Sequence, residues 1–263
     1  MNDAAPKREE RRIEKEIEIA APAEAVWKAL TTGEGLTRWF PLEASVEPGA
    51  GGKITLSWGP EWQATSEITG WEPNRRFAWG TGKPVRMEVT IEARGGKTIV
   101  RLVQSSFSTG ADWENEFYDS TDYGWVFMLV NLRHYLERHA GVARGVAWPR
   151  VKAEMARTSI YERLAGRGGI LGDGAAKDLR EGARYSLRAS TGEAWSGEVK
   201  FVREPRGFCV TVEQLKDGLA WLTIEGGKPP HDVQLWFSTY GLPAAEVKEV
   251  EARWEAELKR ILG

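Results

Sequence analysis

Residues 121–138, TDYGWVFMLVNLRHYLER, decide the expected fold because they predict one long helix with an apolar stripe. Apolar side chains recur at helical spacing in this stretch, at Trp125, Met128, Leu129, Leu132 and Leu136. Such a stripe is the face that a helix lays against a sheet. We therefore expect the residues that precede the helix to supply that sheet.

Upstream of the helix, alternating apolar and polar residues predict several strands. Residues 15–20, 53–58 and 85–91 alternate in this way, which is typical of strands with one buried face. A glycine pair at positions 95 and 96 predicts a tight hairpin between two further strands. Hairpins of this kind make the sheet antiparallel.

Two short helices are expected between the first strand and the others. Pro22 suits the first turn of one of them. A turn at residues 33–35 precedes the second, at residues 36–40, which Pro41 ends. Strand, two short helices, antiparallel strands and a long helix together make an α+β layer architecture.

The same series of motifs occurs twice along the chain. Four segments match in the same order at offsets of 129 to 134 residues: 26–30 with 160–164, 62–77 with 195–208, 89–97 with 222–228, and 125–132 with 254–261. Matches in constant order and at nearly constant offset indicate a tandem duplication. We predict a disordered leader at residues 1–12, a first domain at 13–142 and a second, degenerate domain at 143–263.

Composition excludes several classes of protein. Hydrophobic residues make up 41% of the 263 residues and charged residues 28%, which is typical of a soluble globular protein. The net charge of −2 supplies no general attraction for nucleic acid or for an anionic membrane. The N-terminus has no apolar stretch like a signal peptide, and no run is long enough to span a membrane. We expect a cytoplasmic protein.

Catalytic groups, metal ligands and cofactors are not expected. His134 and His139 are five residues apart, about 140° around a helix, so we do not expect them to share a metal. Cys209 is the only cysteine and lies in an apolar strand, so it is expected to be inert core. The glycine pair before Lys97 imitates the end of a phosphate-binding loop, but the first glycine of that motif is missing.

A small-molecule site is the main functional candidate. Strand parity and the helical stripe place large apolar side chains between sheet and helix: Trp58, Trp79, Met87, Trp125 and Met128. Gln104 and Ser106 continue the inward parity of their strand and would add polar contacts to an apolar concavity. The alternative is that these two residues lie where the strand leaves the core and meet water.

Acidic residues precede the long helix, at Asp112, Glu114, Glu116, Asp119 and Asp122. One interpretation is that they complement the helix dipole on a solvated surface. The other is that they form an acidic rim at the mouth of the cavity.

A group of motifs in the first copy carries a family resemblance. They are Ala21-Pro22, residues 26–31, Trp39-Phe40, residues 51–53, Gly124-Trp125, Leu129, Leu132 and residues 135–137. On these motifs the copy resembles the SRPBCC superfamily of START-like, helix-grip proteins. Within it, the copy is similar to the C-terminal domain of the activator of the 90-kilodalton heat-shock protein ATPase.

The resemblance implies a curved antiparallel sheet wrapped around a long C-terminal helix, with a hydrophobic cavity between them. Members of the superfamily bind lipids, hormones or polyketides, and a minority catalyse cyclisation or dehydration. We expect non-enzymatic binding of a small hydrophobic molecule in the first domain of a monomer or homodimer. The alternatives are a co-chaperone-like role with a chaperone as partner, and a polyketide cyclase or dehydratase.

Overall fold

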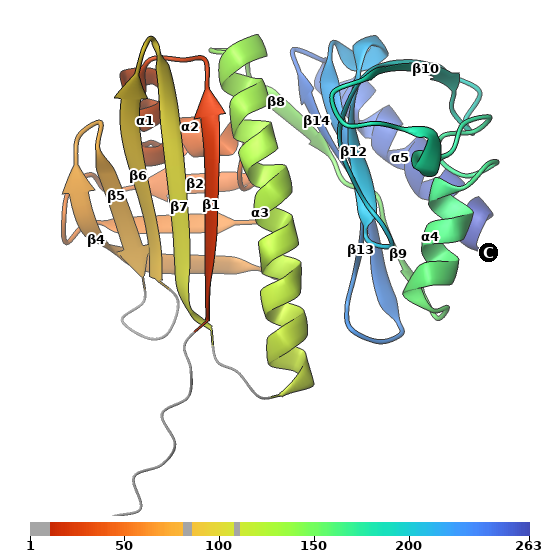
Figure 1. The fold of residues 1–263 in the computed structure, drawn as a ribbon, viewed down its shortest axis with the longest axis horizontal. Helices are drawn as coiled ribbons and strands as arrows, with labels where there is room; N and C mark the ends of the chain where they lie inside the picture. The colour runs from red at the N-terminus through yellow and green to blue at the C-terminus, as the bar shows by residue number, and fades with distance from the viewer. Residues whose placement is uncertain (1–10, 81–85, 108–110) are drawn as a thin grey trace, which may run out of the picture. The chain divides into compact units, whose positions relative to one another are not determined.

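The computed structural model describes residues 11–80, 86–107 and 111–263, except for the side chain of Ser106. The chain divides into two compact units, Met1–Ala140 and Gly141–Gly263 (Figure 1). Of the expected leader, residues 1–10 lie outside the described residues, and the first strand already begins at Arg11. Across the described ranges, no helix combines the length and apolar character that crossing a bilayer requires.

The first unit is built on a seven-stranded antiparallel sheet in the order β1-β7-β6-β5-β4-β3-β2. Strands β2 to β7 form a meander of hairpins, and β1 returns to pair with β7. The strands are β1 (Arg11–Ile19), β2 (Glu43–Val46), β3 (Lys53–Ser57), β4 (Gln63–Glu72), β5 (Arg76–Gly80), β6 (Arg86–Arg94) and β7 (Lys97–Phe107).

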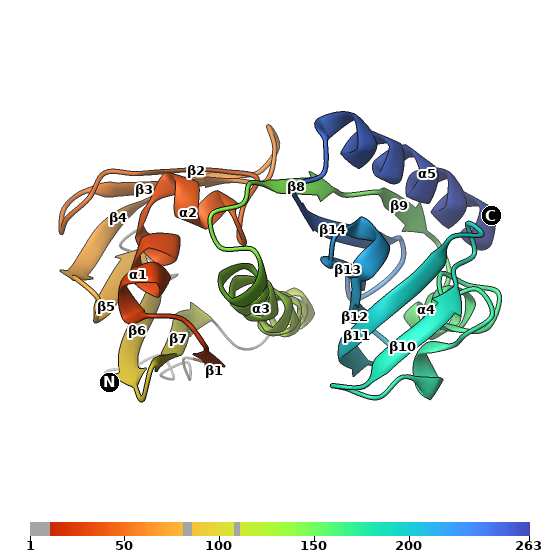
Figure 2. The same ribbon diagram turned by 90° about the horizontal axis from the view of Figure 1, so that it is seen from above.

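Three helices, α1 (Ala23–Thr31), α2 (Gly33–Thr37) and α3 (Asp112–Arg138), cover one side of this curved sheet (Figure 2). Most of the predicted stripe of α3 is buried, at Trp125, Leu129, Leu132 and Leu136, whereas Met128 is half-buried. An antiparallel sheet with its helices on one face confirms the predicted α+β class.

The long helix begins at Asp112, so the prediction of a start near residue 121 was wrong. The Glu114 carboxylate accepts a hydrogen bond from the backbone N–H of Ala111 and caps the helix there. Trp113 and Phe117 lie in the first turns of the helix and are 69% and 47% exposed. The apolar residues of this part do not form a buried stripe, so helical periodicity does not reveal it. The acidic residues that were expected to precede the helix are therefore part of it.

The second short helix also begins earlier than expected, because the residues predicted as a turn form its first turn. The Thr32 hydroxyl accepts a hydrogen bond from Gly35 N at 2.9 Å and caps the helix. A Cβ on Gly35 would lie 2.3 Å from the carbonyl oxygen of Lys28, so the close approach of α1 and α2 requires glycine there.

The second unit repeats this plan with one strand fewer between its first helix and its last. Its sheet has the order β10-β11-β12-β13-β14-β8, and β9 also pairs with β14. The elements are β8 (Arg144–Ala147), β9 (Arg150–Ala153), α4 (Arg157–Ala165), β10 (Arg184–Arg188), β11 (Ala194–Arg203), β12 (Gly207–Val212), β13 (Gly218–Glu225), β14 (His231–Tyr240) and α5 (Ala244–Leu262), with two short 3₁₀ turns at Ala176–Asp178 and Glu213–Leu215.

The two units share the order of their main elements. In each, the first strand pairs with the last strand, and one long helix follows. The repeated sequence segments fall on matching elements: α1 and α4, β5 and β12, β6 and β13, α3 and α5. The chain therefore consists of two tandem helix-grip domains. The second ends in a helix of 19 residues, against 27 in the first.

Cys209 lies on β12 and is fully buried, and that burial raises the pKa of its thiol. We expect the native protein to resist a thiol-specific aromatic disulfide reagent, because the buried thiol of Cys209 is neither ionised nor accessible to the reagent. The same protein in denaturant should react at once with a stoichiometry of one. Fast labelling of the native chain would contradict this placement.

Candidate ligand site in the first unit

Three of the expected site residues lie side by side on neighbouring strands. Trp79 on β5 pairs with Met87 on β6, and Met87 pairs in turn with Gln104 on β7. All three are buried, with Gln104 only 7% exposed. Paired residues of adjacent strands place their side chains on the same face of a sheet. The row therefore presents a ring, a thioether and an amide to the interior.

The long helix meets this row through a hydrogen bond. Trp125 on α3 is buried, and its indole Nε1 donates to Oε1 of Gln104 at 2.6 Å. A buried polar group needs such a partner, because leaving it unpaired costs free energy. The bond ties the helix to the sheet in the middle of an apolar region.

Phe40 connects the remaining tryptophan of the candidate set. Its ring lies 5.1 Å from that of Trp58, edge to face, and 5.1 Å from that of Trp125. Trp58 also lies 4.7 Å from Trp62, whose side chain is 61% exposed. The sequence places Phe40 in a short helix and in a family motif but not in the candidate site, although two adjacent large rings, Trp39 and Phe40, are a signal of a packed region.

The candidate residues therefore differ in how closely they are joined. Trp79, Met87, Gln104 and Trp125 form a continuous group, and Trp58 joins it through Phe40. Met128 is half-buried on α3, one turn beyond Trp125. Ser106 belongs to β7, but its side chain lies outside the described residues.

The acidic residues of α3 have nearby partners. Asp122 and Lys15 form an ion pair at 2.7 Å, and Asp119 lies 3.9 Å from Arg11. Arg11 also donates to Asn115 and stacks on the ring of Tyr118. These contacts bind the first half of α3 to β1. They favour the interpretation of a surface face over that of an acidic rim.

The comparisons with known proteins concern this unit. Residues 20–137 match the family model described as activator of Hsp90 ATPase homolog 1-like protein. Over these residues the first unit is similar to this family, and we call it the AHSA1-like unit. No curated protein shows significant similarity to the chain.

Several solved structures are similar to the chain. The Aha1 dimer from Colwellia psychrerythraea is 24% identical over 50% of this chain and 99% of that one, with a TM-score of 0.44. The Bacillus halodurans protein BH1534 is 24% identical over 48% and 97%, with a TM-score of 0.42. DynU16, a putative protein in the dynemicin biosynthetic locus, is 16% identical over 95% and 96%, also with a TM-score of 0.42.

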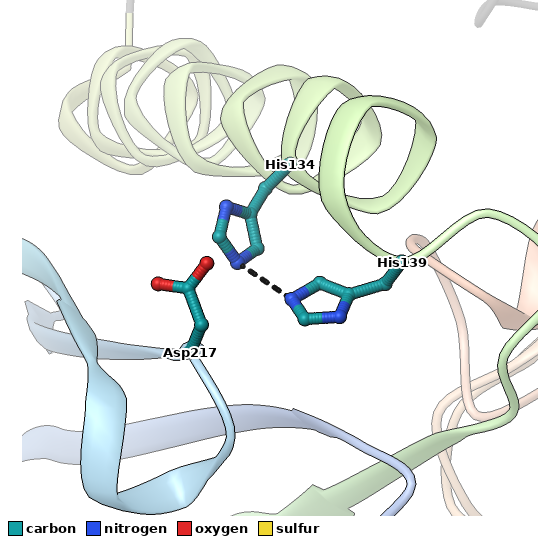
Figure 3. Close-up of side chains that lie close together, drawn as sticks. All are labelled: His134, His139 and Asp217. Atoms are coloured by element: carbon teal, nitrogen blue, oxygen red, sulfur yellow. Dashed lines mark hydrogen bonds between the residues drawn. The ribbon is translucent and has the colours of Figure 1, made fainter.

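At the end of α3, the structure corrects an expectation about the histidines of this AHSA1-like unit. The Nε2 atoms of His134 and His139 lie 3.2 Å apart, within hydrogen-bonding distance (Figure 3). The two rings were expected on different sides of a helix, and this expectation is wrong because His139 lies outside the helix. It is the C-cap, with φ −134° and ψ 21°, and its backbone swings the ring towards His134.

Proposed function

We propose that the AHSA1-like unit binds a small, mostly apolar ligand between its sheet and α3, without catalysing a reaction. The observation that carries the proposal is the Gln104 amide, buried beside Met87 and bonded to the Trp125 indole. Mostly apolar walls with a few placed polar groups are the usual composition of a small-molecule site.

The side-chain amide of Gln104 could form further hydrogen bonds to a ligand. Glutamine offers one oxygen acceptor and two N–H donors, and the indole of Trp125 takes the oxygen. In the part of the chain that the structure describes, that indole is the hydrogen-bond partner of the Gln104 side chain. A ligand oxygen that accepts from the amide N–H groups would add a hydrogen bond in a mostly apolar region. We therefore expect an apolar ligand with a carbonyl, carboxylate or hydroxyl oxygen, and Ser106 as a second polar contact by strand parity.

The apolar contacts would come from Trp58, Trp79, Met87, Trp125 and Met128. Rings and flexible thioethers adapt to a ligand more readily than branched side chains that interlock. Trp58 and Met128 are only half-buried, whereas the other three are buried, so the set extends from the interior to the surface. Entry would be from the side of these two residues.

Met128→Trp is expected to weaken ligand binding at least tenfold, because the larger ring would occupy the space of the ligand. Overpacking should also cost about 1–3 kcal/mol of stability. Native mass spectrometry of the full chain would first detect any molecule carried from expression. Calorimetric titration with fatty acids and aromatic polyketides would then compare the variant with wild type.

Met128→Leu is the matched control, since it conserves volume and should bind as wild type does. The proposal fails if wild type carries no molecule and binds none of the panel. It also fails if Met128→Trp binds the ligand as tightly as wild type.

Gln104→Met is expected to destabilise the unit by about 1–3 kcal/mol, because it leaves the Trp125 indole N–H buried without its acceptor. Trp125→Phe removes that donor, so it should cost less in the Gln104→Met background than in wild type. Urea unfolding of the two single variants and the double variant measures the coupling. Strictly additive effects would show that the bond contributes nothing to stability.

A protein-interaction role is the second candidate, and the family match over residues 20–137 favours it. The name of the matched family refers to activation of the Hsp90 ATPase, so the partner would be a 90-kilodalton chaperone. The ATPase rate of that chaperone, measured with and without the full chain, tests the idea. Stimulation that persists in Met128→Trp would separate this role from ligand binding.

A further inference from the structure

The C-terminal end of α3 brings together two imidazoles that the ligand site does not use. His134 projects from the last turns of the helix, and His139 is the residue that caps it. The backbone N–H of His139 donates to the carbonyl oxygen of Tyr135 at 2.9 Å, which fixes where the His139 ring leaves the helix. Both rings therefore lie at the C-terminal end of α3 (Figure 3).

The separation of the two nitrogens fits a shared metal ion. Zinc binds histidine nitrogen at about 2.0–2.1 Å, so two nitrogens 3.2 Å apart would subtend an angle of about 103° at the ion. That angle is close to the tetrahedral value. If the ion lay on the line from each ring centroid through its Nε2 atom, at these distances, the two centroids would be about 5.0 Å apart. They lie 4.9 Å apart.

The position also suits a cation. The last carbonyl groups of a helix carry the negative end of its dipole, which favours positive charge at the C-terminus. In the hydrogen-bonded pair, one ring must carry its proton on Nε2. With the proton of each ring on Nδ1, both Nε2 lone pairs would face the ion.

We propose that His134 and His139 form a binding site for a divalent transition metal ion of the zinc class. Imidazole nitrogen is a preferred ligand of zinc, copper and nickel and a poor ligand of magnesium and calcium. The two histidines supply two positions of a tetrahedral site, and water or another group completes it. Metal binding would join the cap residue to the helix and hold the last turn closed.

The chain has three histidines, so a nuclear magnetic resonance titration can follow every imidazole. Zinc sulfate is added to the ¹⁵N-labelled full chain, and the ring nitrogens are read from a long-range ¹H–¹⁵N spectrum. We expect the Nε2 signals of His134 and His139 to shift together with one saturation curve near one equivalent. His231, in the second unit with Nδ1 2.8 Å from the carbonyl oxygen of Gly226, serves as the internal control and should not shift.

His139→Ala should weaken zinc binding at least tenfold, and unchanged amide signals of β6 and β7 without zinc would show that the first unit of the variant is folded. Glu137→Gln, which removes an exposed carboxylate from the same turn, should bind zinc as wild type does. Calcium should leave all three histidines unchanged. The proposal is overturned if only one of the two rings shifts, if His231 shifts with them, or if His139→Ala retains the affinity of wild type.

Discussion

Trp39→Ala is expected to lower the free energy of unfolding of the first unit by about 3–5 kcal/mol, the range for truncating a large buried aromatic side chain. Trp39 is 2% exposed, and its ring stacks on Phe40 at 5.0 Å. Its indole donates to the carbonyl oxygen of Ala29 on α1, and its own carbonyl accepts from Asn131 on α3. The ring thus fills the space where the short and long helices meet the sheet.

Hydrogen exchange followed by mass spectrometry can assign this loss to the first unit. Amides of β6 and β7 should exchange roughly 150- to 4,000-fold faster in the variant, if exchange follows the open population. Trp62→Ala is the control, since Trp62 is 61% exposed and its loss should change stability by less than about 1 kcal/mol. Equal effects of the two substitutions would refute the assignment of Trp39 to the core.

Trp254→Ala is expected to cost the second unit a similar amount, about 3–5 kcal/mol. Trp254 is 1% exposed on α5, and its ring lies 5.0 Å from Trp195 and 5.9 Å from Phe237. These rings join the last helix to β11 and β14, so the substitution would leave a cavity between helix and sheet.

Cys209 provides a direct measurement of this effect, because β12 must open before the thiol can react. At low reagent concentration the labelling rate follows the open population, so Trp254→Ala should label roughly 150- to 4,000-fold faster. Lys248→Ala, at an exposed position of the same helix, should label as wild type does. A Trp254→Ala variant that labels no faster would show that the ring carries little of the stability.

Local sequence patterns were sufficient to predict much of the fold. The alternation at residues 53–58 and 85–91 predicted β3 and β6, because one face of each strand is buried. The two glycines at positions 95 and 96 have φ of 57° and 82°, the backbone that a two-residue hairpin requires. That hairpin sets the register of β6 on β7, which is why strand parity could place Met87 beside Gln104.

Other elements depend on contacts between distant residues and leave no local pattern. The edge strand β2 has only four residues, none of them fully buried, and it exists because β3 offers it a backbone edge. The first turns of α3 are held by bonds such as that between Lys15 and Asp122, which lie 107 positions apart. The meeting of His134 and His139 depends on the backbone angles of one cap residue, which helical spacing cannot anticipate.

The pairing of first and last strands has a consequence for how the chain folds. In the first unit Ile19 pairs with Thr98, and in the second Ala153 pairs with His231, so each closes a loop of about 80 residues. The hairpins of β2 to β7 can form as soon as each strand is made, whereas β1 must wait for β7. During synthesis the first strand of each unit is thus among the last to pair with its neighbour in the sheet. The ribosome must release almost a whole unit before its sheet can be completed.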